Sequence, residues 1–156
     1  MNEVEYYQHI RQWAKDRNLI EGSTPTAQFV KLVEEFREIR HDAKDGIGDC
    51  LVVMTIICAQ RGIEIEYLMG TPIDGEDYSL GALGLLAADI ARGRCIINSM
   101  QNLIAVINDN CRVYHQKKID CLAQAWGEIK DRKGRMINNV FVKEEDLCNT
   151  QAQSPL

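Results

Sequence analysis

The sequence predicts an all-α protein with a four-helix-bundle core, made from two helical hairpins and flanked by N- and C-terminal helices. Three observations support this fold class. The chain has only three prolines in 156 residues. Apolar residues recur at intervals of three and four over most of its length, which is typical of amphipathic helices. Residues 50–59 are almost wholly apolar, a run that is too short to cross a bilayer and suits a buried helix.

A first helix is predicted over residues 3–17, and a second begins where Thr24 precedes Pro25. Thr is a favourable N-cap, and Pro fits the first turn of a helix because the N–H groups there have no helical partner. The apolar residues of this second helix, Val30 and Val33 among them, are expected to face the core.

The same periodicity predicts the later elements. Further helices are expected at residues 44–60, 79–91, 94–111 and 116–130, with a short helical segment at 63–68. Residues 132–144 are expected to form an irregular or β-like arm. A weak internal repeat places Leu51 over Leu103. Either the two hairpins are true repeats, or any two amphipathic hairpins align this well. Residues 1–147 are thus interpreted as one domain, and the polar residues 148–156 as a disordered tail.

Composition narrows the class of protein. A net charge of −5 argues against a nucleic-acid-binding protein, which usually has a basic face. No segment is long enough to span a membrane, and the acidic N-terminus does not resemble a signal peptide, so a cytoplasmic protein is expected. The six cysteines form no C-x-x-C pair, which favours buried, reduced thiols over disulfides or zinc ligands.

Six carboxylates lie within a short stretch of the chain: Glu34, Glu35, Glu38, Asp42, Asp45 and Asp49. Their spacing puts Glu34 and Glu38, and likewise Asp45 and Asp49, on one face of a helix. If the chain reverses at residues 41–43, the two sets meet. Like charges repel unless a cation lies between them, and Mg²⁺ or Mn²⁺ prefers oxygen ligands.

The alternative is a solvated acidic helix face. Asp49 argues against it, because Asp49 directly precedes the apolar run, where a carboxylate needs a partner. The pattern therefore predicts a metal site among these acids.

Two segments resemble a known family. Thr24-Pro25-x-x-Gln28-x-x-Lys31-Leu32-x-Glu34-Glu35-x-x-Glu38, followed by Ile47-Gly48-Asp49, resembles the MazG-like all-α nucleoside triphosphate pyrophosphohydrolases, whose signature is EExxE, a spacer and ExxD. Trp126-x-x-Ile129-Lys130-x-Arg132-Lys133-Gly134-Arg135-Met136, followed by residues 140–144, is similar to the ending of phage-type members.

The resemblance implies hydrolysis of a (deoxy)nucleoside triphosphate to the monophosphate and pyrophosphate, with two or three Mg²⁺ or Mn²⁺ ions. It implies a homo-oligomer, a dimer or tetramer, in the host cytoplasm if the chain is phage-encoded. A purine deoxynucleotide, dGTP, is the first expectation for the substrate. The implied catalytic residues are Glu34, Glu35, Glu38 and Asp49, and these four together with Asp45 are the expected metal ligands. The neighbouring cations Lys31, Lys130, Arg132 and Lys133 are expected to bind phosphate oxygens. The candidates for contact with the base are Trp13, Gln28, and Asn98 or Gln101.

The chain departs from the family at Gly46, where the signature has an acid, and Asp45 is the expected substitute. Two other functions therefore stay open. His41-Asp42 is a literal HD dipeptide, as in HD-type dNTP phosphohydrolases, although His9 and His115 have no evident reason to join it. Loss of an acid at Gly46 would also suit a catalytically silent helical scaffold or regulator. The basic residues near Lys130 have a structural alternative, since cations favour a helix C-terminus.

Overall fold

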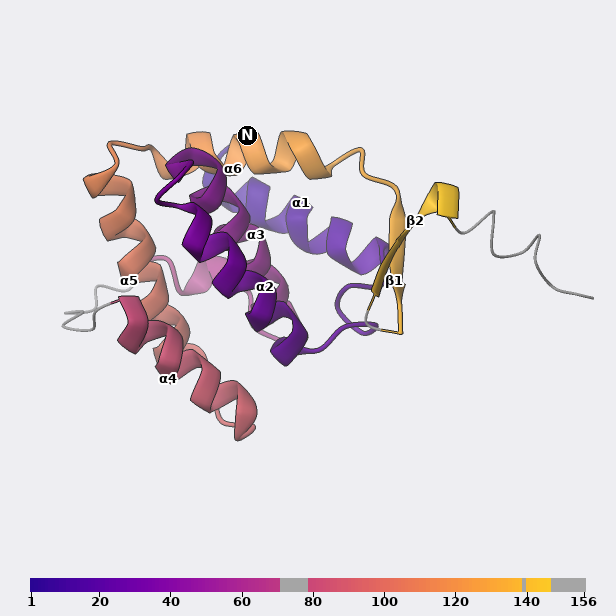
Figure 1. Cartoon of the computed structure of the whole chain (residues 1–156), viewed down its shortest axis with the longest axis horizontal. Coiled ribbons are helices and arrows are strands. Elements are labelled where there is room, and N and C mark those ends of the chain that lie inside the picture. The colour runs from indigo at the N-terminus through magenta and orange to yellow at the C-terminus, as the bar shows by residue number, and fades with distance from the viewer. Residues whose placement is uncertain (71–78, 139, 147–156) are drawn as a thin grey trace, which may run out of the picture.

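The computed structural model describes residues 1–70, 79–138 and 140–146 and confirms the all-α prediction (Figure 1). Each predicted helix is present, with ends shifted by a few residues at most. The elements are α1 (Glu3–Asp16), α2 (Pro25–Glu38), α3 (Ala43–Gln60), a 3₁₀ turn η1 (Ile65–Tyr67), α4 (Ser79–Ala91), α5 (Ile97–Val113), α6 (Lys118–Ile129), and strands β1 (Gly134–Ile137) and β2 (Val140–Lys143). The predicted tail lies outside the described residues.

The first three helices begin at polar N-caps. The side-chain oxygens of Asn2, Thr24 and Asp42 each accept a hydrogen bond from the backbone N–H three residues later, at 3.0, 3.1 and 3.2 Å. These bonds satisfy N–H groups that have no partner within the helix, so short-range sequence decides where α1, α2 and α3 begin. Asp42, one of the six clustered acids, is therefore the cap of α3.

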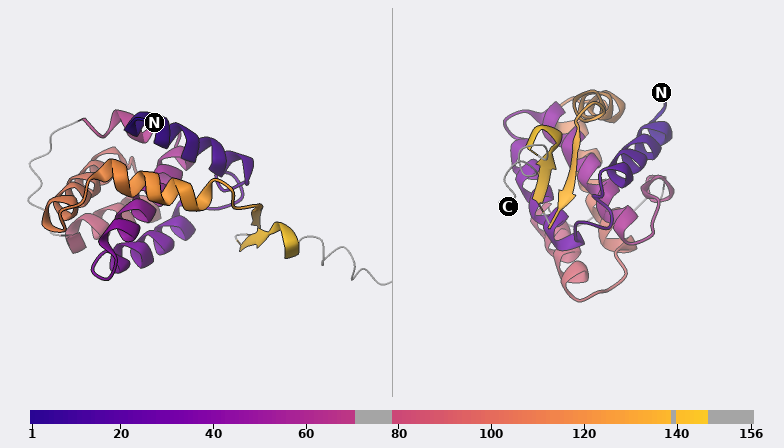
Figure 2. Two further views of the ribbon diagram at one scale, coloured as in Figure 1. Left: turned by 90° about the horizontal axis from the view of Figure 1, so that it is seen from above. Right: turned by 90° about the vertical axis from the view of Figure 1, so that its right-hand side faces the viewer.

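Helix α3 is the centre of the molecule. It contacts α1, α2, α5 and α6, and Leu51, Met54 and Ile57 along its length are completely buried. The α2–α3 hairpin packs against the α4–α5 hairpin through α2 with α4 and α3 with α5, while α1 and α6 lie together over another side of α3 (Figures 1 and 2). The core is thus two hairpins with flanking N- and C-terminal helices.

Two expectations about burial were wrong. Val30 and Val33 are 57% and 41% exposed, whereas Gln28 and Leu32 are the buried residues of α2. Only a narrow stripe of α2 faces α3, and residues four apart share that stripe while those between them turn away. Among the cysteines described, Cys95 is exposed, although the others are buried free thiols as expected.

The predicted arm is an antiparallel hairpin in which Met136 pairs with Phe141. Figure 2 shows the two strands at one end of the molecule. Met136 fastens the hairpin to the end of α1, because its N–H donates to the Arg17 carbonyl at 2.9 Å and its carbonyl accepts from Asn18 Nδ2 at 3.2 Å. Of the helices described, none is long and apolar enough to cross a membrane.

Candidate functional site

Asp49 lies near the start of α3 in an acidic environment. Burial, together with the negative charges of Glu35, Asp45 and Glu128, raises the pKa of its carboxyl group to about 6, while Lys31 acts in the opposite direction. Carboxylates from α2, α3 and α6 therefore converge around a half-buried acid. The structure brings Glu35, Asp45 and Asp49 into one electrostatic cluster, as expected from their spacing.

Glu128 is the member of this cluster that sequence reasoning missed. Helices α3 and α6 approach closely at Gly48, where an added Cβ would lie 2.5 Å from the Cys121 carbonyl oxygen. Beside this crossing, Gln124 Nε2 donates to Asp45 Oδ1 at 3.2 Å. Glu128 is one helical turn beyond Gln124, as Asp49 is one turn beyond Asp45. The only signal in the sequence is this matched spacing, which has meaning only once α3 and α6 are known to touch.

Gly46 occupies the position where the family signature has an acid. A Cβ there would lie 2.6 Å from the backbone nitrogen of Ile39, so the end of α2 approaches α3 too closely for a side chain. The tight α2–α3 turn therefore requires glycine at this position. Asp45, its predicted substitute, instead faces α6 through Gln124 and contributes to the charge around Asp49.

The remaining predicted ligands are less enclosed. Glu34 and Glu38 are exposed, and Glu35, whose side chain is 17% exposed, forms an ion pair with Lys31 at 3.1 Å. Within the described ranges, no group of three or more His, Cys, Asp or Glu residues is arranged so that it could hold a metal ion by itself. The HD dipeptide is therefore not part of such a group among the described residues. Its His41 is exposed and accepts a hydrogen bond from Arg40.

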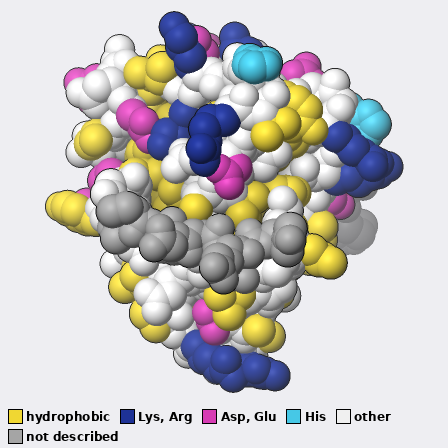
Figure 3. All heavy atoms as spheres, turned by 90° about the vertical axis from the view of Figure 1, so that its left-hand side faces the viewer, with side chains coloured by type: hydrophobic (Ala, Val, Ile, Leu, Met, Phe, Trp, Pro, Cys, Tyr) yellow, Lys and Arg dark blue, Asp and Glu magenta, His cyan; other side chains and the backbone are white. Residues whose placement is uncertain are grey.

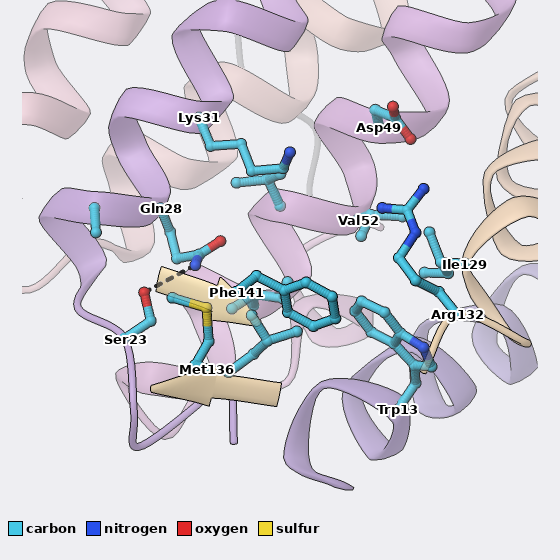
Figure 4. A pocket seen from close by; sticks show the side chains of 14 residues that line it. Trp13, Ser23, Gln28, Lys31, Asp49, Val52, Ile129, Arg132, Met136 and Phe141 are labelled. Carbon is cyan, nitrogen blue, oxygen red and sulfur yellow. Dashed lines mark hydrogen bonds between the residues drawn. The ribbon is translucent and has the colours of Figure 1, made fainter. Parts of the chain in front are cut away.

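A cavity of about 360 Å³ adjoins Asp49 (Figure 4). This volume lies within the range of small-molecule sites. Its walls come from α1, α2, α3, the end of α6 and the β-hairpin. The lining residues are Trp13, Leu19, Ser23, Ala27, Gln28, Lys31, Asp49, Val52, Val53, Ile56, Ile129, Arg132, Met136 and Phe141.

The polar residues that line the cavity are a charged group and a neutral group, and Lys31 of the charged group lies about one helical turn beyond Gln28 of the neutral group (Figure 4). Lys31, Asp49 and Arg132 form one group. Ser23 and Gln28 form the other, and there Gln28 Nε2 donates to Ser23 Oγ at 2.9 Å. A ligand with an anionic end and a flat, mostly apolar end would match this distribution.

Four residues expected to bind substrate, Trp13, Gln28, Lys31 and Arg132, line this cavity. Lys130 and Lys133 are exposed and are not among its lining residues, and Lys133 lies 3.7 Å from Glu144.

Met136 and Phe141 also line the cavity, and sequence reasoning missed them. The sequence predicts a β-like arm but gives no sign that this arm packs against α1 and α2.

Comparison with known proteins finds a phage relative. Over 64 residues, the chain is 52% identical to an uncharacterized 18.2 kDa protein in the rep-hol intergenic region of Haemophilus phage HP1. The match covers 36% of this chain and 39% of the phage protein, so the chain spans well under half the length of that relative. No protein-family model and no solved structure matches the chain significantly.

Proposed function

We propose that the protein is a metal-dependent nucleoside triphosphate pyrophosphohydrolase, which releases pyrophosphate and a nucleoside monophosphate. The observation that carries this proposal is the position of Asp49, a carboxyl group with a pKa raised to about 6 that borders a ligand-sized cavity. Perturbed acids in such places are typical of functional sites. The EExxE motif and the ending that resembles MazG-like enzymes support the same function.

The donor set suits Mg²⁺ or Mn²⁺. Mg²⁺ usually binds through one or two carboxylates and completes its shell with water and substrate phosphates, so a compact group of three acids is not required. Glu35 and Asp49 would hold the first ion, and Asp45, Glu38 and Glu34 would hold further ions through water or orient the attacking water. When bound, the metal would lower the pKa of that water and neutralise charge on the phosphates.

The residues of the cavity have separate roles in this proposal. Lys31 and Arg132 would bind phosphate oxygens, Arg132 through the two-pronged geometry of its guanidinium group. Trp13 and Phe141 would lie against the nucleoside. The first expected substrate is a purine deoxynucleotide such as dGTP, acted on in the cytoplasm.

We also propose that the protein is a homo-oligomer. Leu80 of α4 and Val30 of α2 are 82% and 57% exposed, and these two helices contact each other. Figure 3 shows further hydrophobic side chains at the surface on the side of the molecule where α4 and α5 lie. Large exposed apolar side chains on adjoining helices are typical of subunit interfaces.

The test is a product analysis. The purified protein is incubated with ribo- and deoxyribonucleoside triphosphates and Mg²⁺ or Mn²⁺, and products are resolved by ³¹P NMR. Pyrophosphate with monophosphate is the expected result. Tripolyphosphate would indicate an HD-type reaction, and no product would indicate a silent scaffold. The hydrolysis rate of Asp49→Asn should fall below about a tenth of the wild-type rate. The rate of the control variant Asp16→Asn, which changes an exposed carboxylate, should not.

A further inference from the structure

We propose that the Ser23–Gln28 end of the cavity is a nucleobase subsite in which Gln28 Oε1 accepts a hydrogen bond from an exocyclic amino group. The preferred base is then adenine, guanine or cytosine, and not thymine or uracil. This inference rests on the proposed function for the identity of the ligand class, but base binding is measurable without hydrolysis.

The first support is an unpaired polar atom. Gln28 is only 5% exposed, and its Oε1 accepts no hydrogen bond from any of the described residues. Leaving a buried carbonyl oxygen unpaired costs about 1–3 kcal/mol, and most such groups in folded proteins have a partner. A ligand that donates an N–H group to Gln28 would remove this cost.

The second support is the orientation of the amide. Gln28 Nε2 donates to Ser23 Oγ at 2.9 Å, and Ser23 is itself only 6% exposed. With the nitrogen held in this way, the oxygen points away from Ser23, towards the space between Lys31 and Phe141 (Figure 4). The cavity therefore presents an acceptor that is already oriented before a ligand binds.

The third support is the rest of the cavity wall. Trp13, Leu19, Met136 and Phe141 give the cavity aromatic and apolar walls. In Figure 4, Arg132 and Asp49 lie away from the Ser23–Gln28 pair, and Lys31 lies between them and Gln28. A nucleobase is flat, apolar on its faces and polar at its edge. A nucleoside phosphate therefore matches both groups of polar residues at once.

The preference for an amino group follows from counting partners. Thymine and uracil present their ring N–H between two carbonyl oxygens, and both oxygens would enter the cavity with it. Three other donors line the cavity, but Lys31 and Arg132 would bind the phosphates in the proposed function, and the unpaired Trp13 Nε1 lies away from Gln28 (Figure 4). The Ser23 hydroxyl is then the donor left beside Gln28, so one carbonyl would stay unpaired at a cost. The amino group of adenine or cytosine has a single neighbouring ring acceptor, which Ser23 can satisfy.

The experiment compares nucleoside monophosphates that differ by one amino group, by calorimetry without metal. The pairs are AMP with purine riboside monophosphate, GMP with IMP, and CMP with its 4-deamino analogue. For the preferred base, loss of the amino group should weaken binding to the wild type by roughly 10- to 100-fold, and TMP and UMP should bind more weakly still. In Gln28→Leu, the difference within that pair should fall below about threefold.

Gln60→Leu is the matched control. Gln60 Oε1 is also buried without a partner among the described residues, but Gln60 does not line the cavity. This variant should keep the wild-type preference. Circular dichroism checks that both variants are folded. If Gln28→Leu does not fold, Ser23→Ala replaces it and should reduce the preference, because the amide is no longer held.

Equal binding within every pair, tightest binding of TMP or UMP, or an unchanged preference in Gln28→Leu would overturn the subsite. An amino-dependent preference without triphosphate hydrolysis would support the subsite and overturn the proposed function. Hydrolysis without an amino-dependent preference would support the proposed function and overturn the subsite.

Discussion

At the residue scale, Asp49 couples stability to pH. Burial and neighbouring acids raise the pKa of its carboxyl group from 3.8 to about 6 in the folded protein. Between these values the folded state holds a proton that the unfolded state releases. The proton therefore stabilises the fold at low pH, and this contribution is lost as the pH rises from about 4 through about 6.

Asp49→Asn should remove that pH dependence. Without metal at pH 7.5, the variant should melt roughly 2–4 °C above the wild type, about 1 kcal/mol once solvent screening of this part-exposed group is allowed for. Thermal melts from pH 4 to 8 in EDTA measure the difference. If the melting temperatures of the two proteins change with pH in the same way, the Asp49 carboxyl group is not the cause of the pH dependence. Added Mg²⁺ should raise the melting temperature of the wild type more than that of the variant.

Asp45 and Asp42 form a second comparison at the residue scale. Asp45 is near Asp49 and accepts a hydrogen bond from Gln124, whereas Asp42 is exposed and caps α3. Asp45→Asn should raise the metal concentration for half-maximal hydrolysis roughly tenfold. Asp42→Asn should change this metal concentration little. It should also leave the stability of the fold unchanged, because Asn is also a good N-cap. Equal, small effects in a metal titration would exclude Asp45 from the metal site.

At the element scale, the close approach of α3 to α6 depends on Gly48. An added Cβ would lie 2.5 Å from the Cys121 carbonyl oxygen, and backbone cannot yield as a flexible side chain would. Gly48→Ala should therefore destabilise the fold by about 1–3 kcal/mol in urea denaturation.

Gly127 of α6 is the control for this substitution, because a Cβ added there would point into open space. Gly127→Ala should be neutral or stabilising by about 0.5–1 kcal/mol, since Ala favours a helix. Equal changes in stability in the two variants would mean that the close approach of α3 to α6 at Gly48 does not decide the outcome.

The elements also show which features are predictable from sequence. Helix starts such as Thr24-Pro25 depend on hydrogen bonds between residues a few positions apart, so the pattern itself contains them. The exposure of Val30 and the charge of Glu128 beside Asp49 depend on which helices touch, and no short-range pattern specifies this. The cavity is also not predictable from a short-range pattern, because its lining residues Phe141 and Trp13 come from distant segments of the chain.

At the scale of the whole molecule, the exposed apolar residues predict self-association. Light scattering after gel filtration should give the mass of a dimer or tetramer. Leu80→Lys should shift the population towards the monomer, because burying an unpaired charge in an interface is costly. Val140→Lys is the control, since Val140 is 62% exposed on β2, on the opposite side of the molecule from α4 and α5 (Figure 1). A monomer in the wild type would contradict the proposed oligomer.

The hairpin that fastens Met136 to Arg17 has a consequence for how the protein is made. One wall of the cavity, at Trp13, belongs to α1, and another, at Phe141, belongs to β2 and is synthesised after helices α1 to α6. A nascent chain can assemble its helical core while the cavity is still open on the hairpin side. In the proposed function, the nucleotide would therefore be enclosed only after Phe141 has emerged from the ribosome, when helices α1 to α6 are already available to pack.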